Sequence, residues 1–261
     1  VKVRQTKGQI SPATRTEAVL TITQNPGNVR QGSTTLYQFG RKDAMPGVQT
    51  VSDGSFTPNG GNNMSIQNGI RHPENFYNSG PSWYNNPPTG YSYYNLWSMN
   101  NTATGFNDDA VVKTIYDPCP AGFHMPASNA FTGFTTNGQN GGTMNVSGAW
   151  DHGWNFNNKI TSPDATVYFP ASGYRIGFDG SLGGVGNDGY YWSAVPYDTG
   201  SGCDLYFDQW NVLPRYYGIR AFGFSVRPVA EPKTRVTPKL PGSTEEDWSN
   251  NEDLDAGDID I

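Results

Sequence analysis

Between residues 189 and 229, side-chain types that build a protein core alternate with types that bind ligands. Through Leu205-Tyr206-Phe207-Asp208 the alternation is strict, and a period of two sends the two sets to opposite faces of a strand. Tyr, Trp and Arg dominate binding hot spots and also supply the anchors of antibody paratopes. The pattern predicts a ligand-binding face made of Tyr197, Asp198, Ser201, Asp204, Tyr206, Asp208, Trp210, Arg215, Tyr216, Tyr217 and Ile219.

The opposite face of this stretch is predicted to be buried, because its positions are aromatic or aliphatic. The residues expected in this core are Tyr191, Trp192, Leu205, Phe207, Val212, Phe222, Phe224 and Val226. Exposed substitutions usually change stability by no more than about 0.5 kcal/mol. A protein with separate core and binding faces would therefore tolerate sequence change on the binding face.

Catalytic side chains form no recognisable constellation in the sequence. His72, His124 and His152 lack metal-ligand spacing, and there is no nucleophile elbow or phosphate-binding loop. Asp204 and Asp208 offer the carboxylate pair that glycoside cleavage needs. Four residues along a strand separate their Cα atoms by about 13 Å, which exceeds the separation in glycosidases. The sequence therefore predicts a binding protein and no enzyme.

Residues 107–109, Asn-Asp-Asp, carry the oxygen ligands that Ca²⁺ prefers, but such a run is also typical of a solvated loop. Residues 253–257 imitate the start of a calcium-binding loop and lack its later Glu. No cofactor is therefore expected, with Ca²⁺ as the alternative.

Cys119 and Cys203 leave two arrangements open. Cys119 lies in an Asp-Pro-Cys-Pro segment typical of a rigid turn, whereas Cys203 lies within the predicted binding stretch. An even number of cysteines in a surface protein permits a disulfide bond. The alternatives are one bridge, or a core Cys119 with a separate Cys203.

Composition favours a loop-rich β protein, since aromatic residues make up 13% of the 261 residues, charged residues 15%, and glycines number 32. No run approaches the roughly 20 apolar residues that a spanning helix needs, so no direct membrane span is expected. Acidic and basic residues balance over 1–230, and the net charge of −6 comes from 231–261. The chain therefore lacks the basic footprint of a nucleic-acid-binding protein.

The predicted elements indicate an α+β fold. Strand signals cover 18–23, 35–39, 111–116, 167–171, 189–195, 203–212 and 222–229. Helix signals cover 71–77 and 128–134. We expect an N-terminal arm or linker over 1–17, one domain over 18–230 with the binding face at 190–229, and an acidic flexible tail over 231–261. A tail of this kind is a solvated segment or a docking peptide anchored by Trp248, Leu254, Ile259 and Ile261.

Separate motifs of the chain resemble the Fibrobacter-type major paralogous domain of fimbrillin-like surface proteins from gut anaerobes. They are IYDPCPAGFHMP at 115–126, YFPASGYR at 168–175, GSL with GYYWS between 180 and 193, GFSVRP at 223–228 and LYQFGRKD at 36–43. The resemblance covers roughly 18–230. It implies a C-type-lectin-like fold with mainly antiparallel strands, two short helices and long loops. It also implies an extracellular location and a binding or adhesive role without a reaction.

Residues 190–229 also resemble the variable region of proteins diversified by a diversity-generating retroelement, which randomises adenines in template codons such as those of Asn. Residues reachable from an Asn codon occupy 197–204, 206, 208, 213, 215–217, 219 and 221, whereas Gln209 and Trp210 lie outside that set. This resemblance implies an adhesin on a bacterial surface or a receptor-binding protein of a phage tail. Its ligand would be a protein or glycan on another cell surface.

Other functions remain as alternatives. A fimbrial structural or tip subunit would polymerise through an exchanged strand. An enzyme related to the formylglycine-generating enzymes would need a closely spaced reactive cysteine pair, and Cys119 and Cys203 are far apart in sequence. A glycan-active enzyme is a further alternative.

Overall fold

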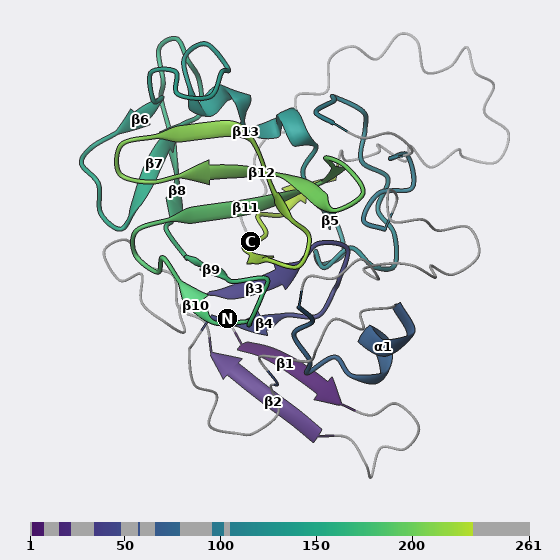
Figure 1. The fold of residues 1–261 in the computed structure, drawn as a ribbon. Helices are drawn as coiled ribbons and strands as arrows, with labels where there is room; N and C mark the ends of the chain where they lie inside the picture. Colours follow the sequence, from purple (N-terminus) through teal and green to yellow (C-terminus); the bar gives the residue numbers. More distant parts are fainter. Residues whose placement is uncertain are drawn as a thin grey trace, which may run out of the picture. The chain divides into compact units, whose positions relative to one another are not determined.

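The computed structural model describes residues 2–7, 16–21, 34–47, 57, 66–78, 96–101 and 105–231 (Figure 1). The chain divides into two compact units, Val1–Ala230 and Glu231–Ile261. Apart from Glu231, the predicted acidic tail lies outside the described residues, and its predicted flexibility and docking residues stay predictions. Part of the predicted arm forms β1 (Lys2–Lys7), which pairs antiparallel with β2 (Thr16–Thr21).

Described secondary structure is mostly strand, so the predicted α+β class is wrong. The helical segments are α1 (Ile66–Arg71) and the 3₁₀ helix η2 (Ser128–Phe134). The helix predicted over 71–77 is wrong because Pro73 lacks a backbone N–H and the α-helical hydrogen bonds stop before it. The helix predicted over 128–134 has the predicted bounds but 3₁₀ geometry, in a segment that holds a glycine and few strong helix formers.

The central sheet has the order β11-β12-β13 and is antiparallel throughout. Its strands are β11 (Gly189–Pro196), β12 (Ser201–Phe207) and β13 (Val212–Ile219). The predicted strand at 203–212 therefore consists of most of β12, a turn and the first residue of β13. The pairing register between β12 and β13 shifts between Asp204 and Tyr206, which marks a β-bulge or irregularity.

Among the described residues, the strands outside this sheet form further sheets and strand pairs, and the first of them joins segments far apart in the sequence. Its order is β10 (Leu182–Gly183), β9 (Tyr174–Arg175), β14 (Gly223–Phe224), β3 (Thr35–Gln38) and β4 (Met45–Pro46). A second is β6 (Val146–Ser147), β7 (Gly153–Asn157) and β8 (Thr166–Pro170). The remaining pairs are β15 (Val229–Ala230) with β5 (Phe123–His124), and β1 with β2.

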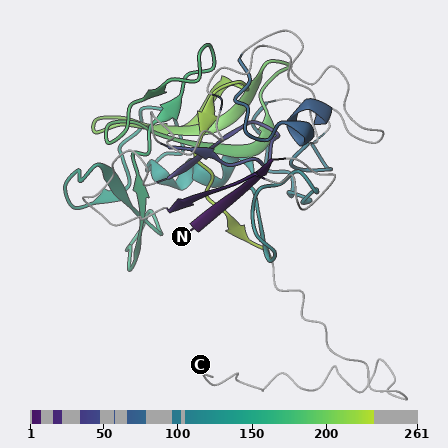
Figure 2. The same cartoon turned by 90° about the horizontal axis from the view of Figure 1, so that it is seen from below.

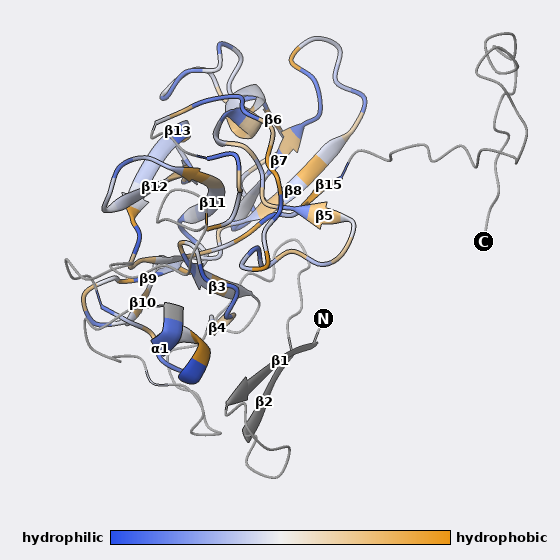
Figure 3. Cartoon of the chain, turned by 90° about the vertical axis from the view of Figure 1, so that its right-hand side faces the viewer, coloured by the Kyte–Doolittle hydropathy of each residue, from blue (hydrophilic) through white to orange (hydrophobic). Residues whose placement is uncertain are grey.

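The hydrophobic core packs against both faces of the central sheet. Tyr191, Leu205 and Phe207 pack with Phe156 of β7 and Phe169 of β8. Figure 1 shows β6–β8 (teal) beside the central strands (green), Figure 2 gives the view from below, and in Figure 3 hydrophobic (orange) residues of β8 alternate with paler ones. A large aromatic core of this kind contributes much of the apolar burial that stabilises the fold.

On the other face, Trp192 packs against Phe224 and Phe39, with ring centroids 4.3 and 5.4 Å away. Most of the predicted core is confirmed, because Tyr191, Trp192, Leu205, Phe207, Val212 and Phe224 are buried. Phe222 and Val226 are only partly buried.

The strand predicted over 111–116 is wrong, although the segment is rich in β-branched residues. Within the described residues, the β-type pairing of this segment is an isolated antiparallel bridge between Lys113 and Ser98. The Lys113 ammonium instead donates to the carbonyls of Cys119, Pro120 and Phe123 at 2.6 to 2.7 Å. Backbone carbonyls of the loop thereby gain a charged donor, which favours an irregular path over a strand.

Candidate ligand-binding site

A row of aromatic rings crosses the central sheet and continues onto β9. Each ring in this aromatic row has its centroid 3.9 to 6.0 Å from that of the next. In spatial order the row is Phe106, Tyr197, Tyr217, Tyr216, Tyr206, Tyr190, Tyr174 and Phe222. Contacts in this range are those of offset and edge-to-face aromatic pairs, which stabilise one another.

The pairing register of the strands brings together the tyrosines in the middle of the aromatic row. Tyr190 of β11 lies opposite Tyr206 of β12, and Asp204 of β12 lies opposite Tyr216 of β13. Residues directly opposite in antiparallel strands have neighbouring side chains, so the tyrosines meet across strands. At one end, the rings of Tyr197 and Tyr217 are stacked with centroids 3.9 Å apart and planes 2° apart.

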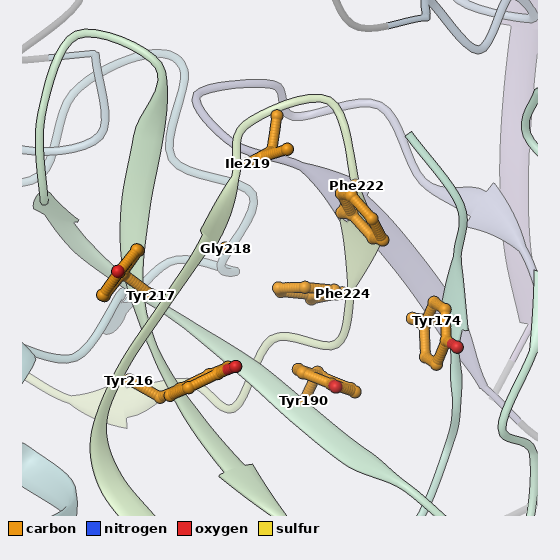
Figure 4. Close-up of a pocket in the computed structure, with 8 residues that line it drawn as sticks. All are labelled: Tyr174, Tyr190, Tyr216, Tyr217, Gly218, Ile219, Phe222 and Phe224. Carbon is orange, nitrogen blue, oxygen red and sulfur yellow. The ribbon is translucent and has the colours of Figure 1, made fainter. Parts of the chain in front are cut away.

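A pocket of about 250 Å³ opens within the aromatic row (Figure 4). Phe224 lies at the centre of the view, the hydroxyl of Tyr216 points toward Tyr190, and Tyr174 closes the side formed by β9. Its volume lies just below the range of drug-sized sites, so it fits a single side chain or one small ring. The lining residues are Tyr174, Tyr190, Tyr216, Tyr217, Gly218, Ile219, Phe222 and Phe224.

The carboxyl group of Asp204 lies directly behind this lining. A Cβ atom added to Gly218 would lie 3.1 Å from Asp204 Oδ2 and 2.6 Å from the Phe224 ring. Only 1% of Asp204 is exposed, and neither carboxyl oxygen has a hydrogen-bond partner in the described part of the chain. Burial raises the pKa of Asp204 well above its usual value, because a charged carboxylate is poorly solvated there. The prediction that Asp204 is exposed is therefore wrong.

The hydroxyl groups of Tyr190 and Tyr206 are held in the neutral form. Burial raises the pKa of both phenols, and the neighbouring carboxylates, Asp188 for both and Asp208 for Tyr206, raise it further. Tyr206 donates a hydrogen bond to Asp208 Oδ2 at 3.0 Å. Burial and the charge of Asp208 also raise the pKa of Asp188. These phenols can exchange hydrogen bonds with a ligand but are poor nucleophiles.

The structure brings together only part of the predicted binding set. Tyr197, Tyr206, Tyr216 and Tyr217 belong to the aromatic row, and Ile219 lines the pocket. Besides the buried Asp204, the other members are Asp198, Ser201, Asp208, Trp210 and Arg215, which lie in two turns or on strands away from the pocket lining.

The two turns lie at opposite ends of the central sheet. Asp198 caps the β11–β12 turn by accepting a hydrogen bond from Gly200 N at 2.8 Å, and Ser201 pairs with Ile219. Asp208 caps the β12–β13 turn by accepting from Trp210 N at 2.7 Å, and Trp210 is 75% exposed.

Arg215 is turned toward another segment of the chain. Its Nε donates to Asn129 of η2 at 3.1 Å, and its backbone exchanges hydrogen bonds with the side chain of Asn140. The guanidinium group therefore holds η2 against β13, the backbone of Arg215 holds Asn140, and Arg215 is not part of the pocket lining.

Several pocket residues were missed by the sequence analysis. Tyr190 follows the same period-two alternation as Tyr206 and was detectable from it. Tyr174 and Phe224 come from β9 and β14, which pair with each other, and local sequence carries no signal for that pairing. Gly218 was missed because close approach of a neighbour to a glycine is visible only in three dimensions.

Metal and thiol sites receive no support from the described residues. No group of three or more His, Cys, Asp or Glu side chains is placed to hold a metal there. Asn107 Oδ1 accepts a hydrogen bond from Asp109 N, and Asp108 and Asp109 are exposed. Cys119 and Cys203 are free and buried, and burial raises the pKa of both thiols, which disfavours the reactive thiolate.

Comparison with known proteins gives one partial match. A family described as Domain of unknown function (DUF8237) matches residues 152–229, which is well under half of the chain. No curated protein and no solved structure matches significantly. Every residue that lines the pocket falls within the matched range, so the site lies in the part of the chain that is similar to this family. No helix among the described segments is long and apolar enough to cross a membrane.

Proposed function

We propose that this chain is a non-enzymatic binding protein, and that the aromatic row with its pocket captures a protein or glycan on another cell surface. The observation that carries the proposal is the continuous aromatic row, whose members on β13, Tyr216 and Tyr217, are 37% and 48% exposed. Exposed tyrosines next to a partly apolar pocket supply rigid contact area together with hydrogen-bonding hydroxyls.

The proposal includes an adhesin on a bacterial cell surface or a receptor-binding protein of a phage tail, with a surface diversified by a retroelement. Most of the proposed variable positions lie at exposed or half-buried sites of the β11–β12 turn and of β12 and β13. The buried exceptions are Gly202, Cys203, Asp204 and Ala221. Variation would therefore be concentrated at the remaining positions, because core substitutions usually destabilise a protein.

Diversification has a direct genomic test. A reverse transcriptase gene beside a near-copy of the codons for 190–229, with Asn codons at the variable positions, would support it. The absence of both from the complete genome would refute diversification and leave the binding proposal standing.

Binding is tested with glycan arrays and with binding of the labelled protein to intact cells. Tyr197→Ala combined with Tyr217→Ala removes the stacked pair, and Ile160→Ala, at a residue 52% exposed, serves as the control. We expect the double variant to lose binding and the control to keep it. Equal binding by both variants would contradict the site. Turnover of a glycan, or a thiol-oxidase activity abolished by Cys119→Ser, would replace the binding proposal with an enzymatic one.

A further inference from the structure

Asp204 is the feature of the site that aromatic stacking leaves unexplained. A buried carboxyl group normally accepts hydrogen bonds or pairs with a cation, because removing it from water is otherwise costly. Asp204 Oδ1 and Oδ2 have no hydrogen-bond partner in the described segments. Its neighbours across the strands are Trp192 and Tyr216, whose side chains supply no positive charge.

The basic residues closest in sequence are engaged elsewhere. Arg220 lies over the ring of Phe39 at 5.0 Å and donates to the carbonyls of Ser201 and Asp198. Arg215 donates to Asn129. Within the described residues, neither arginine forms a hydrogen bond with the Asp204 carboxyl group.

The pocket itself suits a positive group. Tyr174, Tyr190 and Tyr216 line it, and the faces of aromatic rings attract cations. Gly218 adds no side chain beside Asp204, since a Cβ there would lie 3.1 Å from Asp204 Oδ2 and 2.6 Å from the ring of Phe224, which also lines the pocket. A cation in the pocket would therefore be attracted both by the ring faces and by the Asp204 carboxylate next to Gly218 and Phe224.

We propose that this pocket binds an organic ammonium group, with Asp204 as its counter-ion behind Gly218 and the tyrosine rings around it. The inference rests on the proposed function, since it names the ligand class of the same site. An amino sugar and a lysine side chain both carry this group, and the pocket volume of about 250 Å³ fits either.

Binding of the cation is coupled to loss of a proton. Burial without a hydrogen-bond partner favours the protonated form of Asp204 over the carboxylate. Where that proton is present, its O–H bond breaks as the ammonium binds, one proton passes to solvent and the carboxylate remains. Among the described residues, the ionisable groups around Asp204 are Tyr190 of β11, Cys203 and Tyr206 of β12, and Tyr216 of β13, and the charge of Arg220 acts on Cys203. The pKa values of Tyr190, Cys203 and Tyr206 are raised, so these groups stay neutral near pH 7.

The two acids beyond Tyr206 complete the electrostatic surroundings. Asp208 accepts the Tyr206 hydroxyl hydrogen bond, and the pKa of Asp188 is raised by burial and by Asp208. An Asp188→Asn variant shows which acid releases the proton on ligand binding. If the proton comes from Asp204, this variant should still release it. A release that disappears with Asp188→Asn and persists with Asp204→Asn would overturn the assignment.

The test uses isothermal titration calorimetry with paired probes that differ in charge. Methyl glucosaminide and N-α-acetyl-lysine methylamide carry an ammonium, and their N-acetylated counterparts do not. We expect at least one ammonium probe to bind about tenfold more tightly than its acetylated partner. The comparison between the two ammonium probes distinguishes the sugar source from the peptide source.

Variants and buffers identify the group responsible. Asp204→Asn should weaken the ammonium probe about tenfold, whereas Asp108→Asn, at an exposed acid, should leave binding unchanged. In wild type, titrations in buffers of different ionisation enthalpy should show proton release, a measurement that needs no variant. Circular dichroism of each variant checks that the fold is kept.

Two results overturn the inference. One is equal affinity for charged and acetylated probes, and the other is no binding of any ammonium probe up to about 10 mM. In either case, loss of glycan or cell binding by the Tyr197 and Tyr217 double variant would leave the proposed function intact. Retained binding by that double variant would instead remove the proposed function.

Discussion

Asp117 and Asp204 both have buried carboxyl groups, and the chain surrounds them in opposite ways. Asp117 Oδ1 accepts a hydrogen bond from Cys119 N at 2.7 Å, and its Oδ2 accepts from Met125 N at 2.9 Å. Asp204 has no such partner in the described ranges. The first acid holds a turn together within the protein, whereas the second has unused acceptors behind a pocket. The difference separates a carboxylate that stabilises the fold from one available to a ligand.

The largest expected effect comes from Asp117→Ala. It would leave the buried N–H groups of Cys119 and Met125 without acceptors, at a cost of about 3–5 kcal/mol, because hydrogen bonds to charged groups are worth about 1.5–3 kcal/mol each. Urea denaturation, with a check that the m-value is unchanged, measures the loss. A destabilisation below about 1 kcal/mol would show that water replaces the carboxylate and that the two acids do not differ as described.

Asp204→Leu is expected to act in the opposite direction. Leu has the branched skeleton of Asp with methyl groups in place of the oxygens, so it adds apolar surface beside Trp192 and Phe224 and removes a buried group with unsatisfied acceptors. The free energy of unfolding should rise by about 1–3 kcal/mol. Asp108→Leu, at an exposed position, is the matched control and should change it by no more than about 0.5 kcal/mol. Destabilisation by Asp204→Leu would indicate that the carboxyl group has a structural role.

The pH dependence of stability tests the raised pKa of Asp204 in a protein that keeps Asp117 unchanged. Because its folded-state pKa is raised, the unfolded chain loses its proton first as the pH increases. Stability is therefore highest below the unfolded pKa of Asp204 and falls as pH rises toward the folded pKa. The contribution approaches about 1.4 kcal/mol per pH unit within that window. Thermal unfolding of wild type and Asp204→Leu across this window measures the contribution as their difference, which should grow with pH. A constant difference would contradict the raised pKa.

The sequence predicted what depends on neighbouring residues along a strand. Period two along β12 placed Leu205 and Phe207 in the core and Tyr206 in the aromatic row, because alternation is a local property of extended backbone. The same reasoning placed Asp204 on the face of Tyr206 but treated that face as exposed. Phe224, which arrives through β14, covers part of it, and sequence spacing carries no information about such a contact.

In two loop segments, local sequence preference predicts a conformation that the structure does not have. The β-branched run at 111–116 is organised by the Lys113 ammonium and three carbonyls, which a strand pattern does not reveal. The predicted helix at 71–77 treated Pro73 as a helix start, whereas α1 ends at Arg71 before it. Both errors concern which of two locally acceptable conformations the tertiary contacts select.

The smallest effect on stability is expected at the mouth of the pocket. Tyr216→Ala removes a ring that is 37% exposed and lies 5.6 Å from Tyr206, so the free energy of unfolding should change by no more than about 0.5 kcal/mol. Binding of the ammonium probe should nevertheless weaken by about 1–2 kcal/mol, because exposed aromatic anchors and cation–π contacts contribute on that scale. Urea denaturation and calorimetry on the same preparation give the two values. Equal losses of stability and affinity would mean that Tyr216 stabilises the sheet. Residues that stabilise the fold, such as Asp117, would then not be distinct from residues that bind the ligand on β13.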